Sequence, residues 1–249
     1  MIRIERIRKR FGGHEVLRGV SLAVRTGATL ALLGPSGVGK SVLLKTIIGL
    51  QEPDEGEVWV DGIELTRAPA RVAEMVRGTM GYVFQYSALF DSLTVGENIL
   101  LGLDDANWRP ESSAARERLK ECLRWVNLDP EVAEQYPGEL SGGMQKRVAV
   151  ARAIVGDQKF LLYDEPTSGL DPLNAENIAG LICRLRKELG VTSIVVTHDL
   201  ELAKYVGDHV AILDGGRIVA DVPAPALDAL DHPMVRAFRH RPGRVECVV

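Results

Sequence analysis

Residues 34–41 read Gly34-Pro35-Ser36-Gly37-Val38-Gly39-Lys40-Ser41, the G-x-x-x-x-G-K-S pattern of a phosphate-binding P-loop. The apolar run Thr29 to Leu33 before it predicts a buried parallel strand, and Lys40 to Leu50 after it predicts a helix. The glycines let the backbone curl until several N–H groups point at one anion, and the helix N-terminus adds the positive end of its dipole. The alternative is a glycine-rich turn before an ordinary helix, and these flanks argue against it.

The side chains around this loop predict nucleotide chemistry. Lys40 is predicted to reach the β- and γ-phosphates of ATP, and the Ser41 hydroxyl to bind Mg²⁺. A P-loop ATPase also needs a second strand that ends in an acid, and the apolar run Phe160 to Tyr163 leads directly into Asp164 and Glu165. Asp164 is predicted to hold Mg²⁺ through water, and Glu165 to polarise the attacking water as a general base. The alternative is a strand that ends in a solvated acidic turn.

A second anion site is predicted at Leu140-Ser141-Gly142-Gly143, which precedes the helical residues Val148 to Ile154. This segment offers a hydroxyl, two exposed backbone amides and a helix dipole. By itself it is also compatible with a simple helix N-cap. A single triphosphate does not need two anion sites in one chain. The P-loop and the Leu140 to Gly143 segment together are the signature of the ATP-binding cassette (ABC) ATPases, which this chain resembles over nearly its whole length.

The resemblance assigns roles to further residues. Phe11 stands where the family places an aromatic ring that stacks on adenine, with a core phenylalanine as the alternative. Gln85 matches the Q-loop glutamine, which touches Mg²⁺ and the attacking water and joins the core to a helical lobe. Asp171, in Ser168-Gly169-Leu170-Asp171, matches the D-loop. His198 matches the switch histidine that contacts the γ-phosphate.

The resemblance also implies an assembly. Two copies of the chain would face each other head to tail, so that each ATP lies between the P-loop of one copy and the Ser141 to Gly143 segment of the other. An integral-membrane permease would hold this pair at the cytoplasmic face of the cell membrane. The implied nucleotide contacts, within one copy and across the pair, are Phe11, Gly34, Pro35, Ser36, Gly37, Val38, Gly39, Lys40, Ser41, Val42, Ser141, Gly142, Gly143 and Asp171. The implied metal ligands are Ser41, Gln85 and Asp164.

Some positions depart from the commonest family pattern. Val42 lacks the hydroxyl that many members place on the α-phosphate, and Met144 replaces the usual signature glutamine. Together with the segments Gln85 to Asn98 and Asp231 to Phe238, they look like the ATPases of Mla-type systems. That resemblance implies phospholipid transport between bacterial membranes, with a permease and an Mce-domain lipid-binding protein as partners. The alternative is an ABC importer or exporter for a different substrate.

The rest of the chain indicates its organisation. Ile2, Ile4 and Ile7 with interleaved charges predict an edge strand, and Val16 to Val24 predict further strands. We therefore expect an α/β fold of the ABC P-loop type: a parallel-sheet core, an antiparallel β subdomain and an inserted helical subdomain. The expected single domain, 1–249, divides into 1–85 and 141–222 for the RecA-like core and β subdomain, 86–140 for the helical subdomain and 223–249 for a C-terminal tail.

The bulk composition limits the function classes. The chain has 249 residues and 46% apolar content, and it lacks an apolar run of the ~18 residues that span a bilayer. We expect a cytoplasmic protein that reaches a membrane only through a partner. The net charge of −4 disfavours nucleic acid binding. The three cysteines, Cys122, Cys183 and Cys247, show no metal-ligand spacing and are expected to be reduced thiols. Arg236, Arg239, Arg241 and Arg244 predict either a solvated tail or a docking arm for a partner subunit or an anionic membrane.

Overall fold

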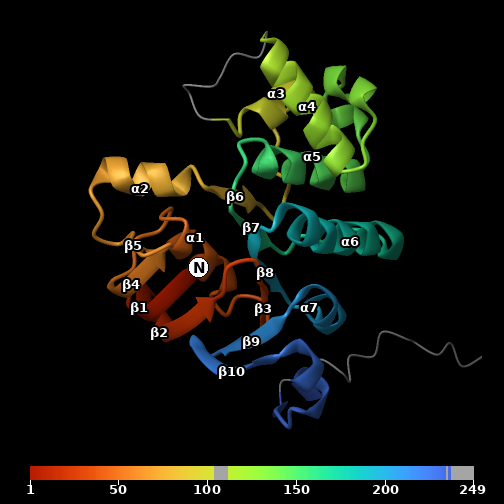
Figure 1. Ribbon diagram of the computed structural model, residues 1–249. Coiled ribbons are helices and arrows are strands. Elements are labelled where there is room, and N and C mark those ends of the chain that lie inside the picture. The colour runs from red at the N-terminus through yellow and green to blue at the C-terminus, as the bar shows by residue number, and fades with distance from the viewer. Residues whose placement is uncertain (104–111, 234, 237–249) are drawn as a thin grey trace, which may run out of the picture.

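Two sheets organise the protein. The computed structural model describes residues 1–103, 112–233, 235 and 236. Arg239, Arg241, Arg244 and Cys247 lie outside these ranges, as does most of the tail for which both a solvated state and a docking role were left open. The larger sheet has the order β10-β9-β3-β8-β7-β6, and the smaller has the order β2-β1-β4-β5 (Figure 1).

The larger sheet is parallel except at one edge. β3, β6, β7, β8 and β9 run parallel to their neighbours, and β10 returns antiparallel along β9. All residues of β3, β7 and β8 are buried, which fits the continuous apolar runs of strands covered on both faces. The strand bounds are Thr29–Leu33 (β3), Met80–Val83 (β6), Phe160–Asp164 (β7), Thr192–Thr197 (β8), His209–Asp214 (β9) and Arg217–Pro223 (β10).

The smaller sheet is antiparallel and corrects one prediction. Its strands are His14–Val24 (β2), Ile2–Phe11 (β1), Glu55–Val60 (β4) and Ile63–Glu64 (β5). β1 lies between β2 and β4, so the prediction of an edge strand at Ile2, Ile4 and Ile7 is wrong. All three side chains are fully buried. Alternation of apolar and charged residues shows only that one face of the sheet is solvated, and interior and edge strands of such a sheet share that pattern.

The helices cover the larger sheet and extend beyond it. α3 starts with a capping box in which the Thr94 hydroxyl accepts from Glu97 N–H, and α6 starts at Pro172 after the N-cap Asp171. No helix within the described ranges is long and apolar enough to cross a membrane. The helices are Lys40–Ile47 (α1), Ala70–Arg77 (α2), Val95–Leu100 (α3), Ser113–Trp125 (α4), Gly142–Ile154 (α5), Pro172–Leu189 (α6) and Leu200–Val206 (α7), with 3-10 turns at Pro130–Glu134, Pro137–Glu139 and Ala224–Ala229.

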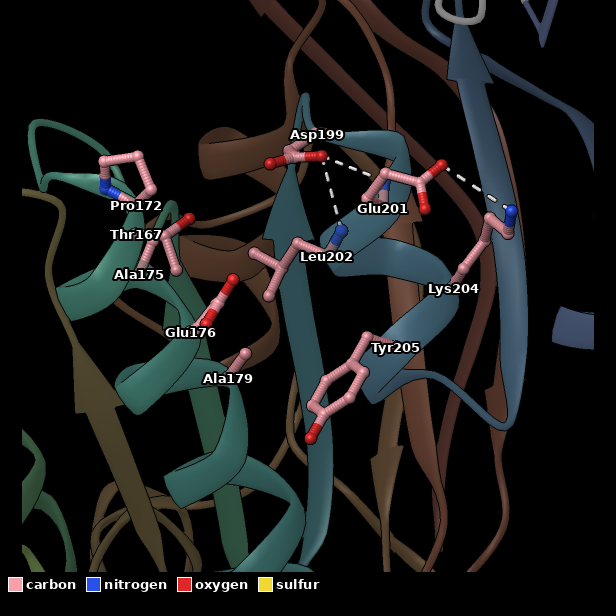
Figure 2. Close-up of a pocket in the computed structure, with 10 residues that line it drawn as sticks. All are labelled: Thr167, Pro172, Ala175, Glu176, Ala179, Asp199, Glu201, Leu202, Lys204 and Tyr205. Atoms are coloured by element: carbon pink, nitrogen blue, oxygen red, sulfur yellow. Dashed lines mark hydrogen bonds and ion pairs between the residues drawn. The ribbon is translucent and has the colours of Figure 1, made fainter.

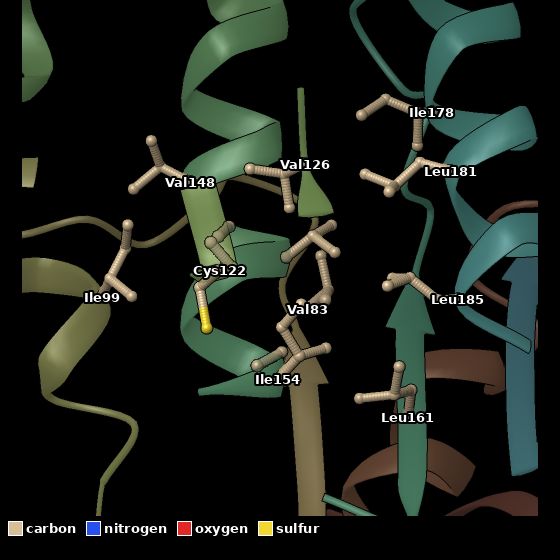
Figure 3. Close-up of a cluster of buried hydrophobic side chains, with 14 of the residues drawn as sticks. Val83, Ile99, Cys122, Val126, Val148, Ile154, Leu161, Ile178, Leu181 and Leu185 are labelled. Carbon is tan, nitrogen blue, oxygen red and sulfur yellow. The ribbon is translucent and has the colours of Figure 1, made fainter. Parts of the chain in front are cut away.

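One hydrophobic cluster ties the helices to the larger sheet. Figure 3 shows side chains of α3, α4, α5 and α6 gathered with those of β6 and β7. α5 is central to this cluster because it packs on α3, α4 and α6 as well as on β6. A displacement of α5 would therefore disturb its packing against both β6 and the helices α3, α4 and α6. The predicted architecture of a parallel core joined to an antiparallel sheet is confirmed.

The carboxyl ends of four parallel strands place the predicted functional residues on one edge. The P-loop follows Leu33 of β3, and His198 follows β8. Asp164 closes β7, and Gln85 comes two residues after β6. Because neighbouring parallel strands end at the same edge of a sheet, residues more than a hundred positions apart in sequence meet there.

Candidate functional site

The P-loop wraps around its own lysine. Lys40 is 5% exposed, and its Nζ donates to the carbonyl oxygens of Gly34 at 2.7 Å and Pro35 at 2.9 Å. Gly39, the N-cap of α1, has φ 108°, a conformation that favours glycine. It offers no side chain to the first N–H groups of α1, which leaves those donors to a ligand.

The antiparallel sheet presses against this loop. A Cβ on Gly39 would lie 2.8 Å from Cγ1 of Val16 in β2. The backbone of Gly216, in the turn between β9 and β10, accepts from Arg18 N–H at 2.8 Å and holds β2 in place. Val16 therefore forms one wall of the site, a role that its place in an alternating strand did not predict.

Asp164 faces the P-loop serine. The Ser41 hydroxyl donates to Oδ1 of Asp164 at 2.7 Å, and the Tyr82 hydroxyl donates to Oδ2 at 3.1 Å. Burial raises the pKa of Tyr82, and the neighbouring carboxylate raises it further, so the phenol stays a donor. The hydroxyl and carboxylate oxygens are the hard ligands that Mg²⁺ prefers, and one carboxylate beside substrate phosphates is a usual number. Ser41 and Asp164 fit the predicted Mg²⁺ site.

The Glu165 carboxylate contacts both Lys40 and His198. Its backbone is in the left-handed region at φ 48°, and its N–H donates to Val196 O at 3.0 Å. Its Oε1 lies 3.3 Å from Nζ of Lys40, and its Oε2 lies 2.9 Å from Nδ1 of His198. The left-handed conformation is costly for glutamate and is held by the surrounding strands. This conformation aims the carboxylate across the P-loop.

These residues enclose a pocket of about 330 Å³. It brings together the P-loop, the second residue after β6, the residue after β7 and the residue after β8. The lining residues are Val16, Ser36, Gly37, Gly39, Lys40, Ser41, Val42, Gln85, Glu165 and His198.

A second group of predicted residues lies apart from this pocket. Ser141 is the N-cap of α5 and accepts from Met144 N–H at 3.3 Å, while Asp171 is the N-cap of α6 and accepts from Asn174 N–H at 3.0 Å. The hydrogen bonds from Asn174 lower the pKa of Asp171. A Cβ on Gly143 would lie 2.4 Å from Oδ1 of Asn174, so the starts of the two helices touch. None of these residues lines the pocket around Lys40.

Phe11 also lies outside the pocket lining. Its ring is 45% exposed, which rules out the alternative of a core phenylalanine. Nζ of Lys9 lies 5.5 Å from the ring centroid, within cation–π range. The exposed face at the end of β1 is compatible with a stacking surface, and adenine stacking stays a prediction.

A larger pocket, about 620 Å³, lies between α6 and α7 (Figure 2). Asp199 caps α7 there by accepting from the N–H groups of Glu201 and Leu202, and Lys204 pairs with Glu201 at 3.6 Å. Asp199, Glu201 and Lys204 thus have partners within this pocket, and it contains none of the predicted site residues. The smaller pocket around Lys40 is therefore the candidate functional site, because it contains the predicted phosphate-binding and acidic residues.

Lys146 is a further residue near the site whose role the sequence analysis missed. It is 5% exposed on α5, and its ammonium donates to the carbonyl oxygens of Gln85 and Phe84. The signal was available, because Lys146 is four residues before buried Val150 and seven before buried Ala153 on the same helical face. A charged residue on that face has to find partners inside the protein.

Comparison with known proteins places these motifs in context. The ABC transporter family model matches residues 17–168. The methionine import ATP-binding protein of Carboxydothermus hydrogenoformans is 41% identical over 202 residues, which is 81% of this chain and 59% of that protein. The sulfate/thiosulfate import ATP-binding protein of Burkholderia mallei is 41% identical over 234 residues, which is 93% of this chain and 64% of that protein. This chain spans less than two thirds of the length of either relative.

A solved structure extends the comparison to three dimensions. The dimeric, post-hydrolysis structure of an ATP-binding cassette bound to ADP and Pi matches this protein with a TM-score of 0.81 and 34% sequence identity. The match covers 90% of this chain and 99% of the other. The fold, and with it the relative placement of the strands that carry the pocket residues, is shared.

Proposed function

This chain belongs to the ABC transporter family, and from that premise we propose that it is the ATPase subunit that powers a membrane transporter. The observation that carries the proposal is the Glu165 carboxylate, which reaches Lys40 with one oxygen and His198 with the other inside the P-loop pocket. A nucleotide-binding protein without turnover needs no carboxylate at that position. The proposal includes the division of the chain into core, helical subdomain and tail given above.

The residues divide the reaction between them. The P-loop N–H groups and Lys40 bind and orient the phosphates of ATP, and Glu165 takes a proton from the attacking water. Nδ1 of His198 lies 2.9 Å from the Glu165 carboxylate, and we assign His198 the γ-phosphate contact that the family resemblance implies. Ser41, Asp164 and Gln85 would hold Mg²⁺, which when bound offsets negative charge on the phosphates. The products are ADP and phosphate.

The second group of residues supports a dimer. Ser141, Gly142 and Gly143 begin a helix that points no residue into the pocket of its own chain. A dimeric arrangement is known for the cassette that shares this fold. We propose that these residues and Asp171 complete the nucleotide site of a second copy, so that ATP holds two copies together.

The transported substrate is where the proposal departs from the sequence-based expectation. The relatives with 41% identity are named as importers of methionine and of sulfate or thiosulfate. They favour the alternative, a transporter for a different and polar substrate, over phospholipid transport with an Mce-domain partner. Phospholipid transport is supported only by the sequence resemblance at Val42, Met144 and the segments Gln85 to Asn98 and Asp231 to Phe238.

Affinity purification of this protein from its native membranes in mild detergent tests the assembly. We expect an integral-membrane permease to be recovered with it, together with a solute-binding protein and without stoichiometric phospholipid, as determined by mass spectrometry. Recovery of an Mce-domain protein with bound phospholipid would instead restore the lipid assignment. Absence of any permease, in preparations that hydrolyse ATP, would contradict the transporter role.

Tyr82→Phe tests the metal side of the site. It removes only the hydroxyl that donates to Asp164 Oδ2, and a hydrogen bond to a charged group contributes about 1.5–3 kcal/mol. We expect the Mg²⁺ concentration for half-maximal ATPase activity to rise roughly tenfold. Tyr163→Phe is the matched control, since the Tyr163 hydroxyl is buried on the adjacent strand and has no hydrogen-bond partner among the described residues. Equal Mg²⁺ dependence of both variants would remove Tyr82 from the site.

A further inference from the structure

The loop that carries Gln85 has a costly backbone. Ser87 and Ala88 have φ 35° and 48°, in the left-handed region that non-glycine residues avoid. Tyr86 between Gln85 and this pair is 83% exposed, while Gln85 itself lines the nucleotide pocket. Such a conformation persists only where the surroundings hold it.

Lys146 supplies part of that support. It lies on α5, and its buried ammonium donates to the carbonyl oxygen of Gln85 and, at 3.4 Å, to that of Phe84. Burial lowers the pKa of Lys146, while the negative charges of Asp164 and Glu165 raise it. The buried ammonium takes these two carbonyl oxygens as partners in place of the water that burial removes.

Arg152, six residues after Lys146 on α5, binds the same loop. Its Nη1 donates to Ala88 O at 2.6 Å and its Nη2 to Ser87 O at 2.8 Å. The two carbonyls it binds belong to the two residues in the left-handed region. Lys146 and Arg152 together thus donate hydrogen bonds to four carbonyl oxygens of the segment 84–88.

Close packing of α5 on β6 brings Lys146 and Arg152 within hydrogen-bond distance of the loop. A Cβ on Gly81 of β6 would lie 2.1 Å from Ala153 O, so α5 rests directly on the strand that leads into the loop. Figure 3 shows Val83 of β6 beside Ile154 of α5 in the same cluster. The helix and the loop are in contact at the strand, at Lys146 and at Arg152.

We propose that Lys146 and Arg152 are positioning residues: they hold the Gln85 loop on α5, so that Gln85 and the Ser141–Gly143 segment at the start of α5 move as one unit. The inference rests on the proposed function, because it concerns how two parts of that nucleotide site are coupled. Gln85 belongs to the pocket of its own chain, and Ser141 to Gly143 belong to the site proposed for the second copy. A displacement of the exposed loop around Tyr86 would then reach both nucleotide sites.

The test compares Lys146→Met and Arg152→Met with a matched control. Each replaces a cation, buried for Lys146 and half-buried for Arg152, by an uncharged side chain of similar length and leaves carbonyl oxygens of the loop unpaired. Arg118→Met is the control: Arg118 also donates to backbone carbonyls at the C-terminal end of α5, those of Ile154 and Val155, and not to carbonyls of the segment 84–88. Lys146→Gln keeps a donor near the Gln85 carbonyl and is the rescue variant.

We expect kcat to fall about ten- to a hundredfold in Lys146→Met, because small misplacements of reacting groups have effects of this size. Nucleotide affinity measured in EDTA should stay within about twofold of wild type, since the P-loop is untouched. Hydrogen exchange of peptides covering 84–90 should accelerate in Lys146→Met and Arg152→Met. Lys146→Gln should recover part of the loss in kcat.

Two results would overturn the inference. One is wild-type exchange over 84–90 in both loop variants. The other is an equal loss of kcat in Arg118→Met, which would assign the effect to general destabilisation of α5. The proposed function fails separately: wild-type protein without ATPase activity would refute it, whereas the exchange experiment reports on the loop without any turnover.

Discussion

Glu165→Gln is expected to lower ATP turnover about a hundredfold or more, because a positioned general base contributes roughly 10²–10⁴ to a rate. The amide is nearly isosteric with the carboxylate, so it leaves the P-loop and the Ser41–Asp164 contact in place. ATP binding should therefore persist. Since hydrolysis would no longer remove the γ-phosphate, ATP should hold two copies together. The measurements are steady-state ATPase activity and size-exclusion chromatography with light scattering, with and without Mg²⁺ and ATP.

A carboxylate outside the site provides the control for this variant. Glu176 lies on α6 in the larger pocket of Figure 2, away from the P-loop. Glu176→Gln makes the same chemical change and should retain wild-type turnover. Multiple turnovers at wild-type rate in Glu165→Gln would refute the general-base role. Loss of turnover without an ATP-dependent dimer would keep that role and refute the proposed two-copy site.

Local motifs made most of the nucleotide pocket predictable. Lys40 and Ser41 follow from an eight-residue pattern, and Asp164 and Glu165 follow from a short apolar strand that ends in acids. Each of these predictions needs only a strand and the residues after it. The parallel sheet then brings the strand ends together, which explains why Gln85 and His198 join the pocket from distant parts of the chain.

Residues that act through long-range contacts were harder to predict. Tyr82 reads as an apolar strand residue, and its hydroxyl finds Asp164 only because β6 and β7 are neighbours in the sheet. Val16 becomes a wall of the pocket because the smaller sheet packs against the P-loop. In both cases the residue type and its strand can be predicted from the sequence. The contact that makes the residue part of the site depends on how elements distant in sequence pack together.

The edge strand prediction failed for a related reason. Charged residues between Ile2, Ile4 and Ile7 report a solvated face of the strand, whereas strand order depends on pairing partners.

The transported substrate is even harder to deduce from this chain. The pocket residues described above are proposed to bind phosphates and Mg²⁺, so the transported substrate cannot be deduced from them.

Lys40→Ala is expected to abolish the ATP-dependent dimer as well as turnover, in contrast to Glu165→Gln. Lys40 is buried among the carbonyl oxygens of Gly34 and Pro35 and the Glu165 carboxylate. Its removal leaves these electronegative atoms facing the phosphate position without a cation. Truncating one partner of a buried charge pair costs about 2–5 kcal/mol, so ATP affinity should fall by about a hundredfold.

Isothermal titration calorimetry with ATP measures this change directly, and Lys45→Ala is the control because Lys45 is an exposed lysine on the same helix. The two site variants together separate binding from chemistry. If Lys40 acts on the phosphates and Glu165 on the water, the double variant should resemble Lys40→Ala, since a base has no effect without bound ATP. An ATP-dependent dimer in the double variant would show that the cation is dispensable for binding, and the assignment of Lys40 would then be wrong.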